Sequence, residues 1–210
     1  MSAISVNVGG RPKGATLERR DIYASEFQTL LDYLQEAKMR DRAKSNAMKA
    51  FHLLFYFGFR VSEIVELKNH HIKKMEREKL ISLGNDTKTK TPRDAYIADA
   101  HIEILKDIFK ESLLDEDDFT LISPTFHPKD YYSKGSLTRM LNRVIHKALG
   151  DQYSTHSFRA GYITSLHRAD VSIKVIQEII GHTKSTTTMR YITVSDEEKR
   201  DAVEKIGQAS

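Results

Sequence analysis

Apolar residues recur every three or four positions along most of the chain. In residues 25–39 this spacing predicts an amphipathic helix. Residues 47–57 form a more apolar run, which predicts a buried second helix, and Gly58 is placed to end it. Ser62 can cap a short third helix that reaches Leu67. Arg60 therefore stands in a tight connection between two apolar helices.

The pattern changes in residues 79–98. Two short runs, 80–83 and 94–97, flank a polar segment that contains Gly84, Asn85 and Pro92. Such an arrangement predicts a β-hairpin with a long basic tip. Residues 119–123 are a further candidate for a short strand.

Helical periodicity returns in the rest of the chain. It covers residues 102–109, then 137–149 before Gly150, 156–168, and 172–180 before Gly181. A narrow apolar stripe predicts a tail helix over 195–206. The predicted fold class is mainly α with a small antiparallel β-sheet. We expect residues 1–20 to form a flexible basic arm, either solvated or lying on a phosphate backbone, and residues 21–210 to form one domain.

Composition narrows the chemistry. The 210 residues include 33 Lys and Arg against 29 Asp and Glu, a formal net charge of +4, and this excess is compatible with a nucleic-acid partner. The sequence has no cysteine, which excludes disulfides, a thiol nucleophile and a Cys-ligated metal. No stretch is apolar enough for a membrane span or a signal peptide. We therefore expect a cytoplasmic protein without a membrane partner, associated with the nucleoid when bound to DNA.

Several cations and imidazoles stand in unusual local contexts. They are Arg60 after the glycine stop, Lys88 and Lys90 on the hairpin tip, His156 and Arg159 at the start of a helix, and His182 after Gly181. Tyr191 follows His182 by nine residues. Such a donor set suits a highly charged oxyanion, and a phosphodiester is the natural candidate. Arginines stabilise charge on non-bridging oxygens, Lys88 can protonate a departing alkoxide, and Tyr191 offers an oxygen nucleophile. This chemistry breaks and rejoins DNA, and it requires neither a metal nor a cofactor.

Four segments resemble the motifs of the tyrosine recombinases, the phage integrase family. Residues 58–67 (GFRVSEIVEL) resemble the first-arginine motif, and 156–159 (HSFR) resemble the His-x-x-Arg box. Residues 180–193 resemble the closing Gly-His and tyrosine segment, and 87–97 align on a lysine followed five residues later by an arginine. This alignment places the lysine at Lys88, with Lys90 as a competitor. The resemblance covers residues 22–206.

The resemblance implies a role for each matched residue. Arg60 and Arg159 would bind the scissile phosphate, His156 would act as a base or phosphate ligand, and His182 would donate to the phosphate. Tyr191 would be the nucleophile. Glu63 resembles a carboxylate that orients the first arginine, although a helix N-terminus also favours a negative charge there. The implied fold is a helical catalytic domain with a small β-sheet.

The implied activity is site-specific DNA recombination through a 3′-phosphotyrosyl intermediate and a Holliday junction. Its partners would be double-stranded DNA carrying a specific recombination site, further copies of the chain that form a tetramer through the tail, and accessory DNA-bending proteins. Alternatively, the tail packs on its own domain. Five cations are candidates for DNA contacts beyond the site, or else for solvated surface: Arg139, Arg143, Lys147, Lys184 and Arg190.

Other interpretations remain at this point. Most members of the family carry an N-terminal DNA-clamping domain, and only about 20 residues precede the first predicted helix here. The chain is therefore a short recombinase or a catalytic fragment. A type IB topoisomerase and a catalytically silent DNA-binding relative share the resemblance. A metal hydrolase would use His70 and His71, expected here in extended structure, together with His52.

Overall fold

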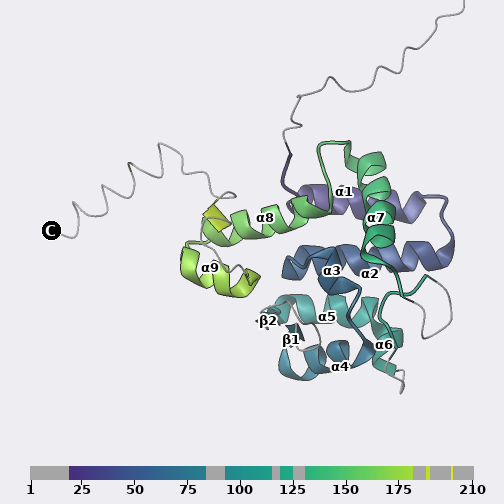
Figure 1. Ribbon diagram of the computed structural model, residues 1–210, viewed down its shortest axis with the longest axis horizontal. Coiled ribbons are helices and arrows are strands. Elements are labelled where there is room, and N and C mark those ends of the chain that lie inside the picture. The colour runs from purple at the N-terminus through teal and green to yellow at the C-terminus, as the bar shows by residue number, and fades with distance from the viewer. Residues whose placement is uncertain are drawn as a thin grey trace, which may run out of the picture.

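The computed structural model describes residues 19–83, 93–114, 119–124, 131–181, 188–189 and 200. Its elements follow in chain order: α1 (Ala24–Glu36), α2 (Asp41–Phe57), α3 (Val61–Ile64), α4 (Asn69–Glu78), β1 (Leu80–Leu83), β2 (Arg93–Tyr96), α5 (Asp99–Ile108), α6 (Lys110–Leu114), α7 (Lys134–Leu149), α8 (Thr155–Arg168) and α9 (Ile173–Ile180). Helices α1, α7 and α8 lie to one side of α2 and α3, whereas α4, α5, α6 and the hairpin lie to the other (Figure 1). The predicted fold class, mainly α with a small antiparallel sheet, is confirmed.

Helix α2 forms the centre of the core. It packs against α1, α3, α5 and α8, and Phe51 and Leu54 on it are fully buried. The ring of Phe51 stacks on that of Phe158 from α8, with 5.7 Å between the ring centroids. Aromatic pairs of this kind add to the free energy gained from burying apolar area. The apolar run of the sequence thus becomes the helix around which the site-bearing elements are arranged.

The hairpin forms as predicted on either side of its tip. Strands β1 and β2 are antiparallel, with Leu80 opposite Tyr96 and Leu83 opposite Arg93. Ile81 and Ala95 are buried and hold the hairpin against the body of the protein. The tip, residues 84–92, lies outside the described residues.

One local prediction was wrong, and one helix was not predicted. The third strand expected over 119–123 is a single bridge, in which Thr120 pairs with Lys68. Helix α4 was missed because the sequence gives it only two buried apolar positions, Ile72 and Met75, on an otherwise polar surface. Among the described residues, no helix combines the length and apolarity that crossing a membrane requires.

Helix α9 connects the helical body with the hairpin. Ile176 and Ile180 of α9 pack with Ile163 of α8 in a small cluster of their own, separate from the main core. Helix α9 also contacts β2. The C-terminal end of α9 is therefore placed between α8 and the hairpin.

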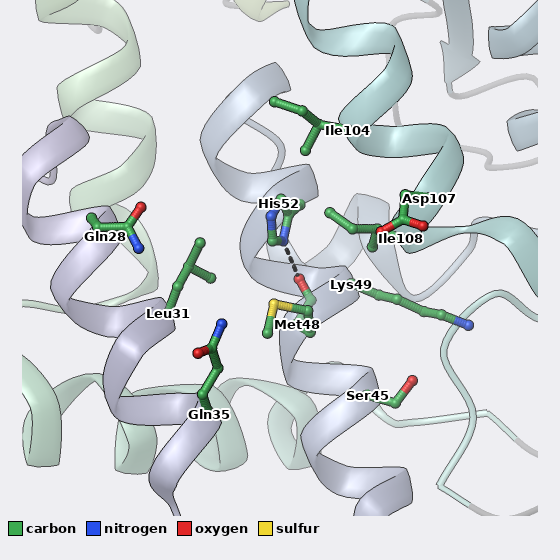
Figure 2. A pocket seen from close by; sticks show the side chains of 10 residues that line it. All are labelled: Gln28, Leu31, Gln35, Ser45, Met48, Lys49, His52, Ile104, Asp107 and Ile108. Atoms are coloured by element: carbon green, nitrogen blue, oxygen red, sulfur yellow. Dashed lines mark hydrogen bonds between the residues drawn. The ribbon is translucent and has the colours of Figure 1, made fainter.

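A cavity of about 510 Å³ opens between α1, α2 and α5 (Figure 2). Leu31, Met48 and Ile104 give it an apolar lining, and His52 contributes from α2. Burial lowers the pKa of Lys49 at its edge. Apart from His52 of the metal-hydrolase interpretation, the lining contains none of the predicted site residues.

Candidate active site

The turn at Gly58 places Arg60. Gly58 adopts a left-handed conformation with φ of 59° and ends α2, as the sequence predicts. A Cβ atom on Gly58 would lie 2.6 Å from Cδ1 of Tyr162, so the turn has no room for a side chain. The chain then buries Phe59 and leaves Arg60 at the N-cap of α3, with its side chain 38% exposed.

Glu63 fixes Arg60 from two directions. Its Oε2 accepts the backbone N–H of Arg60 at 2.6 Å, and its Oε1 accepts from Nη1 of the same residue at 3.1 Å. The carboxylate thus bonds the N-cap residue of α3, and the prediction that Ser62 caps this helix was wrong. Both interpretations of Glu63 apply, because it orients the arginine and also supplies negative charge to the start of α3.

Glu63 is ionised although it is 4% exposed. Burial by itself would raise its pKa, but the charge of Arg93, the hydrogen bond from the Arg60 N–H, and the charges of Arg159 and Arg60 outweigh burial and lower the pKa. Three guanidinium groups therefore gather around one carboxylate.

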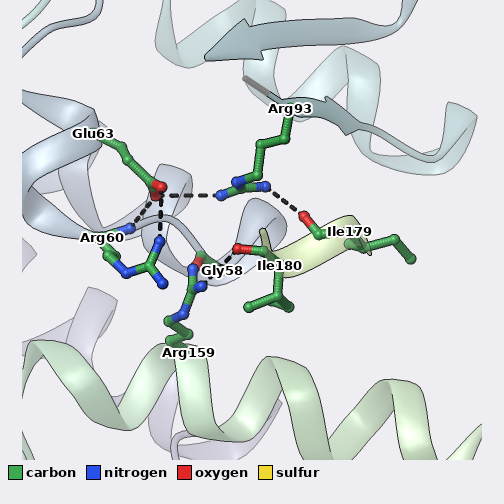
Figure 3. Close-up of polar contacts among 7 residues, drawn as sticks. All are labelled: Gly58, Arg60, Glu63, Arg93, Arg159, Ile179 and Ile180. Atoms are coloured by element: carbon green, nitrogen blue, oxygen red, sulfur yellow. Dashed lines mark hydrogen bonds and ion pairs between the residues drawn. The ribbon is translucent and has the colours of Figure 1, made fainter. Parts of the chain in front are cut away.

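Arg159 joins the ends of two helices. It lies on α8 and is 4% exposed, and its Nη1 donates to the carbonyl of Gly58 at 2.8 Å. Its Nη2 donates to the carbonyl of Ile180 at 2.6 Å. These carbonyls stand at the C-terminal ends of α2 and α9, where the helix dipole favours a cation. The structure thus brings Arg60 and Arg159 into one site (Figure 3).

Arg93 is part of the same cluster, although it was not among the predicted site residues. It is the first residue of β2, and its Nη2 lies 3.2 Å from Oε2 of Glu63. Its Nη1 donates to the carbonyl of Ile179 at 2.5 Å. Arg93 is the arginine of the motif in which a lysine is followed five residues later by an arginine. That spacing was the one signal in the sequence that could have identified Arg93 as a site residue.

His156 lies at the protein surface in the first turn of α8. Partial desolvation lowers its pKa, and the positive charges of Arg19, Lys134, Arg159 and Arg60 lower it further. The imidazole is therefore neutral at neutral pH and able to accept a proton. Arg19 and Lys134 were not among the predicted site residues, because only the fold brings residue 19 and the start of α7 towards α8.

Several predicted residues lie outside the described residues. They are Lys88, Lys90, His182, Lys184, Arg190 and Tyr191, together with the tail 195–206. The last long described stretch ends at Gly181, which ends α9 in a left-handed conformation with φ of 68°. The roles of these residues stay predictions, as does the boundary between the arm and the domain.

The predicted DNA-contact residues on α7 are exposed. Arg139, Arg143 and Lys147 follow one another at i, i+4 spacing, away from the buried positions Leu137 and Leu141. Their contact with DNA stays a prediction.

The histidines of the metal hypothesis are engaged elsewhere. His70 and His71 lie on α4, not in extended structure, with their ring centroids 3.9 Å apart. Nδ1 of His71 accepts the backbone N–H of Lys68 at 3.1 Å, and Nδ1 of His52 lies 2.8 Å from the carbonyl oxygen of Met48. Within the described part of the chain, no group of three or more His, Cys, Asp or Glu side chains could hold a metal ion.

Comparisons of the sequence with known proteins all match the same family. Residues 20–198 match the model of the phage integrase family. The chain is 32% identical over 158 residues to a tyrosine recombinase of Thermosipho africanus, an alignment that covers 75% of this chain and 53% of the relative. It is 31% identical over 195 residues to the tyrosine recombinase XerA of Thermococcus kodakarensis, covering 92% and 62%.

Solved structures share the fold. A crystal structure of XerA recombinase superposes with a TM-score of 0.67 at 21% identity, covering 89% of this chain and 65% of that one. XerH site-specific recombinase bound to its difH substrate gives a TM-score of 0.63 at 16% identity, covering 95% and 58%. The chain thus spans between about half and two thirds of the length of these proteins.

Proposed function

This chain belongs to the phage integrase family, and from that premise we propose that it is the catalytic domain of a tyrosine recombinase that cleaves and rejoins DNA at a specific site. One observation carries the proposal. Arg60 and Arg159 are far apart in sequence, yet the Gly58 turn and the end of α9 hold them in one site. Two guanidinium groups in such a site suit the non-bridging oxygens of a phosphodiester.

Strand cleavage is a transesterification. The hydroxyl oxygen of Tyr191 attacks the scissile phosphorus and forms a 3′-phosphotyrosyl bond, while the bond from phosphorus to the 5′ oxygen breaks. The tyrosine proton passes to His156, whose lowered pKa keeps it neutral beforehand. Lys88, or its competitor Lys90, protonates the departing 5′ oxygen. Arg60, Arg159 and His182 stabilise the charge that develops on the non-bridging oxygens.

Rejoining reverses these steps with a different strand. The 5′ hydroxyl of a second duplex attacks the phosphotyrosine and releases Tyr191, and two such exchanges form and resolve a Holliday junction. Two duplexes, each with two cleavage positions, require four copies of the chain. We propose that the tail 195–206 of one copy docks on its neighbour, and that DNA-bending proteins assist where the site demands it.

Contacts with the DNA backbone extend along α7. Arg139, Arg143 and Lys147 are exposed there, and binding through such residues releases counterions. The logarithm of the binding constant should fall linearly with the logarithm of the salt concentration. Each phosphate contact that is removed should reduce the slope by about 0.9. A slope that is unchanged in Arg139→Gln and Arg143→Gln would exclude this face.

Covalent capture from a pool of random DNA sequences tests the proposal. The 210-residue chain is incubated with duplexes whose central region is randomised and whose top strand is nicked, so that cleavage releases a short fragment and cannot reverse. The DNA that stays bound to the protein after denaturation with detergent is sequenced. Enrichment of one sequence in covalent adducts, in the presence of EDTA, supports a site-specific tyrosine recombinase.

Other outcomes identify the alternatives. Binding without any adduct indicates a catalytically silent relative. Adducts without sequence preference, together with relaxation of supercoiled DNA and no strand exchange, indicate a topoisomerase.

Truncation after Val194 tests the tail: the shortened chain should bind the selected DNA but sediment as a smaller complex than the full chain. Complexes of equal size would indicate that the tail packs on its own domain.

A further inference from the structure

Arg93 is a third guanidinium beside those of Arg60 and Arg159, which the proposed function assigns to the phosphate. Its side chain is 6% exposed, compared with 38% for Arg60. Figure 3 shows it reaching from β2 between Glu63 and the end of α9. Arg159 is equally buried, at 4% exposed, but it donates to two neutral carbonyls. Arg93 is both buried and paired with the carboxylate of Glu63, so its charge is already matched and it is poorly placed to contact DNA itself.

Arg93 shares one partner with Arg60, and its other partner lies next to a partner of Arg159. Oε2 of Glu63 accepts from Nη2 of Arg93 at 3.2 Å and from the backbone N–H of Arg60 at 2.6 Å. On the other side, Arg93 donates to the carbonyl of Ile179, and Arg159 donates to the next carbonyl, that of Ile180. A displacement of Arg93 would therefore loosen the residue that orients Arg60 and also the helix end to which Arg159 is bonded.

The surroundings of Arg93 hold it in one conformation. Its Cζ lies 5.4 Å from the centroid of the Phe59 ring, a cation–π contact. A Cβ on Gly181 would lie 2.6 Å from Cδ of Arg93, so the glycine that ends α9 also makes room for this side chain. The guanidinium is thereby enclosed by the first-arginine turn and by the end of α9.

Stability alone does not account for such an arrangement. A buried ion pair is often no more stabilising than apolar side chains of similar size. The Nε of Arg93 is buried and has no hydrogen-bond partner among the described residues, which is a further cost. A group retained at such a cost is better explained by the geometry that it imposes on its neighbours.

We propose, on the basis of the proposed function, that Arg93 is a positioning residue that holds Glu63, and through it Arg60, and fixes the end of α9 against Arg159. It ties the hairpin to both arginines without touching the DNA. Its two bonds run from different nitrogens to separate acceptors, a geometry that the planar fork of a guanidinium fixes and that the single, freely rotating nitrogen of a lysine does not.

The test compares Arg93→Met and Arg93→Lys with the wild-type chain on the selected nicked duplex, with Arg77→Met, an exposed arginine of α4, as matched control. Arg93→Met should form the covalent adduct about 100-fold more slowly at saturating DNA, the loss typical of a small misplacement of catalytic groups. Its affinity for DNA should be unchanged. Arg93→Lys should recover only part of the rate, and Arg77→Met should behave as wild type.

A double-mutant cycle separates positioning from a general loss of structure. In Arg60→Ala the arginine that Glu63 orients is gone, so adding Arg93→Met should cost roughly tenfold less than it costs in the wild-type background. A second readout uses a methylphosphonate at the scissile position, which removes the phosphate's negative charge. The defects of Arg60→Ala and Arg93→Met should both shrink on this substrate, because the need for an oriented cation falls.

The outcomes are distinct. If the wild-type chain forms no adduct, the proposed function fails. If the wild-type chain reacts and Arg93→Met reacts within twofold of it, the positioning role is overturned. Independent effects in the cycle, or an equal defect on both substrates, would also overturn it, because they indicate a general structural role. If Arg93→Met does not fold, the same cycle and substrate comparison are carried out with Arg93→Lys, which retains the charge and a bond to Glu63.

Discussion

Replacing Gly58 with alanine should destabilise the protein and disturb the site together. At φ of 59° a residue with a Cβ costs about 1–2 kcal/mol relative to glycine. The new Cβ would lie 2.6 Å from Cδ1 and 3.0 Å from Cγ of Tyr162. Overpacking of this kind costs about 1–3 kcal/mol. The free energy of unfolding should therefore fall by about 2–5 kcal/mol, out of the roughly 5–15 kcal/mol typical of a domain.

The two contributions can be separated with Tyr162. Tyr162→Ala removes the ring atoms and leaves only the Cβ, 3.3 Å from the new methyl group. Gly58→Ala in that background should cost only the left-handed contribution, about 1–2 kcal/mol. Tyr162→Phe is the matched control, because it keeps the ring and should preserve the full cost. Denaturant unfolding measures the free energy of all six combinations. In thermal unfolding, Gly58→Ala alone should lose roughly 4–20 °C in Tm.

The same variant should lose activity beyond its loss of stability. The carbonyl of Gly58 accepts from Arg159, so a shift of this turn moves a partner of one arginine and the backbone that leads to the other. At a temperature where the variant is fully folded, formation of the adduct should be about 100-fold slower. An unchanged free energy of unfolding, or equal costs in the Ala and Phe backgrounds, would refute the reasoning.

Three further changes test the chemistry. Tyr191→Phe should abolish the adduct in a denaturing gel and leave DNA binding unchanged in a gel shift, because only the nucleophilic oxygen is lost; a persisting adduct would assign the nucleophile elsewhere. Arg159→Ala should slow cleavage by about 100- to 1,000-fold, and Arg159→Lys should not restore it fully; near-normal cleavage in Arg159→Ala would contradict the site. The cleavage rate at subsaturating DNA should fall only below the ordinary histidine pKa of about 6.5, as protonation disables His156. Lys134→Gln removes one cation that lowers this pKa, so the midpoint should move to higher pH; an unmoved midpoint would argue against His156 as the base.

Features that depend on neighbours in sequence could be predicted. Gly58 and Gly181 end their helices as the pattern indicated, because a left-handed residue after an apolar helical run is a local requirement. The flanks of the hairpin and the buried second helix follow from periodicity for the same reason. Arg60 and Arg159 were identified as site residues by resemblance, and the fold brings them together.

Features that depend on distant partners could not be predicted. Nothing local shows that Arg93 is buried, because its acceptors are Glu63 and a carbonyl of α9, both far away in sequence. The error at Ser62 was a local one: Ser62 is a good N-cap by residue type, yet the carboxylate of Glu63 bonds the N-cap residue Arg60, three residues before it. Helix α4 has too few apolar positions to reveal a period.

The hydrogen-bond acceptors of Arg159 bear on its proposed role in binding a phosphate. Two backbone carbonyls fix its orientation, and each belongs to a helix end that carries only about half an elementary negative charge. Two carboxylates in the same places would orient the guanidinium equally well but would neutralise it and repel a phosphate. Glu63 meanwhile faces the charges of Arg93, Arg159 and Arg60 together, so the cluster keeps an excess of positive charge. The arginines of the proposed site are thus oriented by bonds within the protein and still lack the negative charge that a phosphodiester would supply, which is the arrangement that would stabilise charge developing at phosphorus.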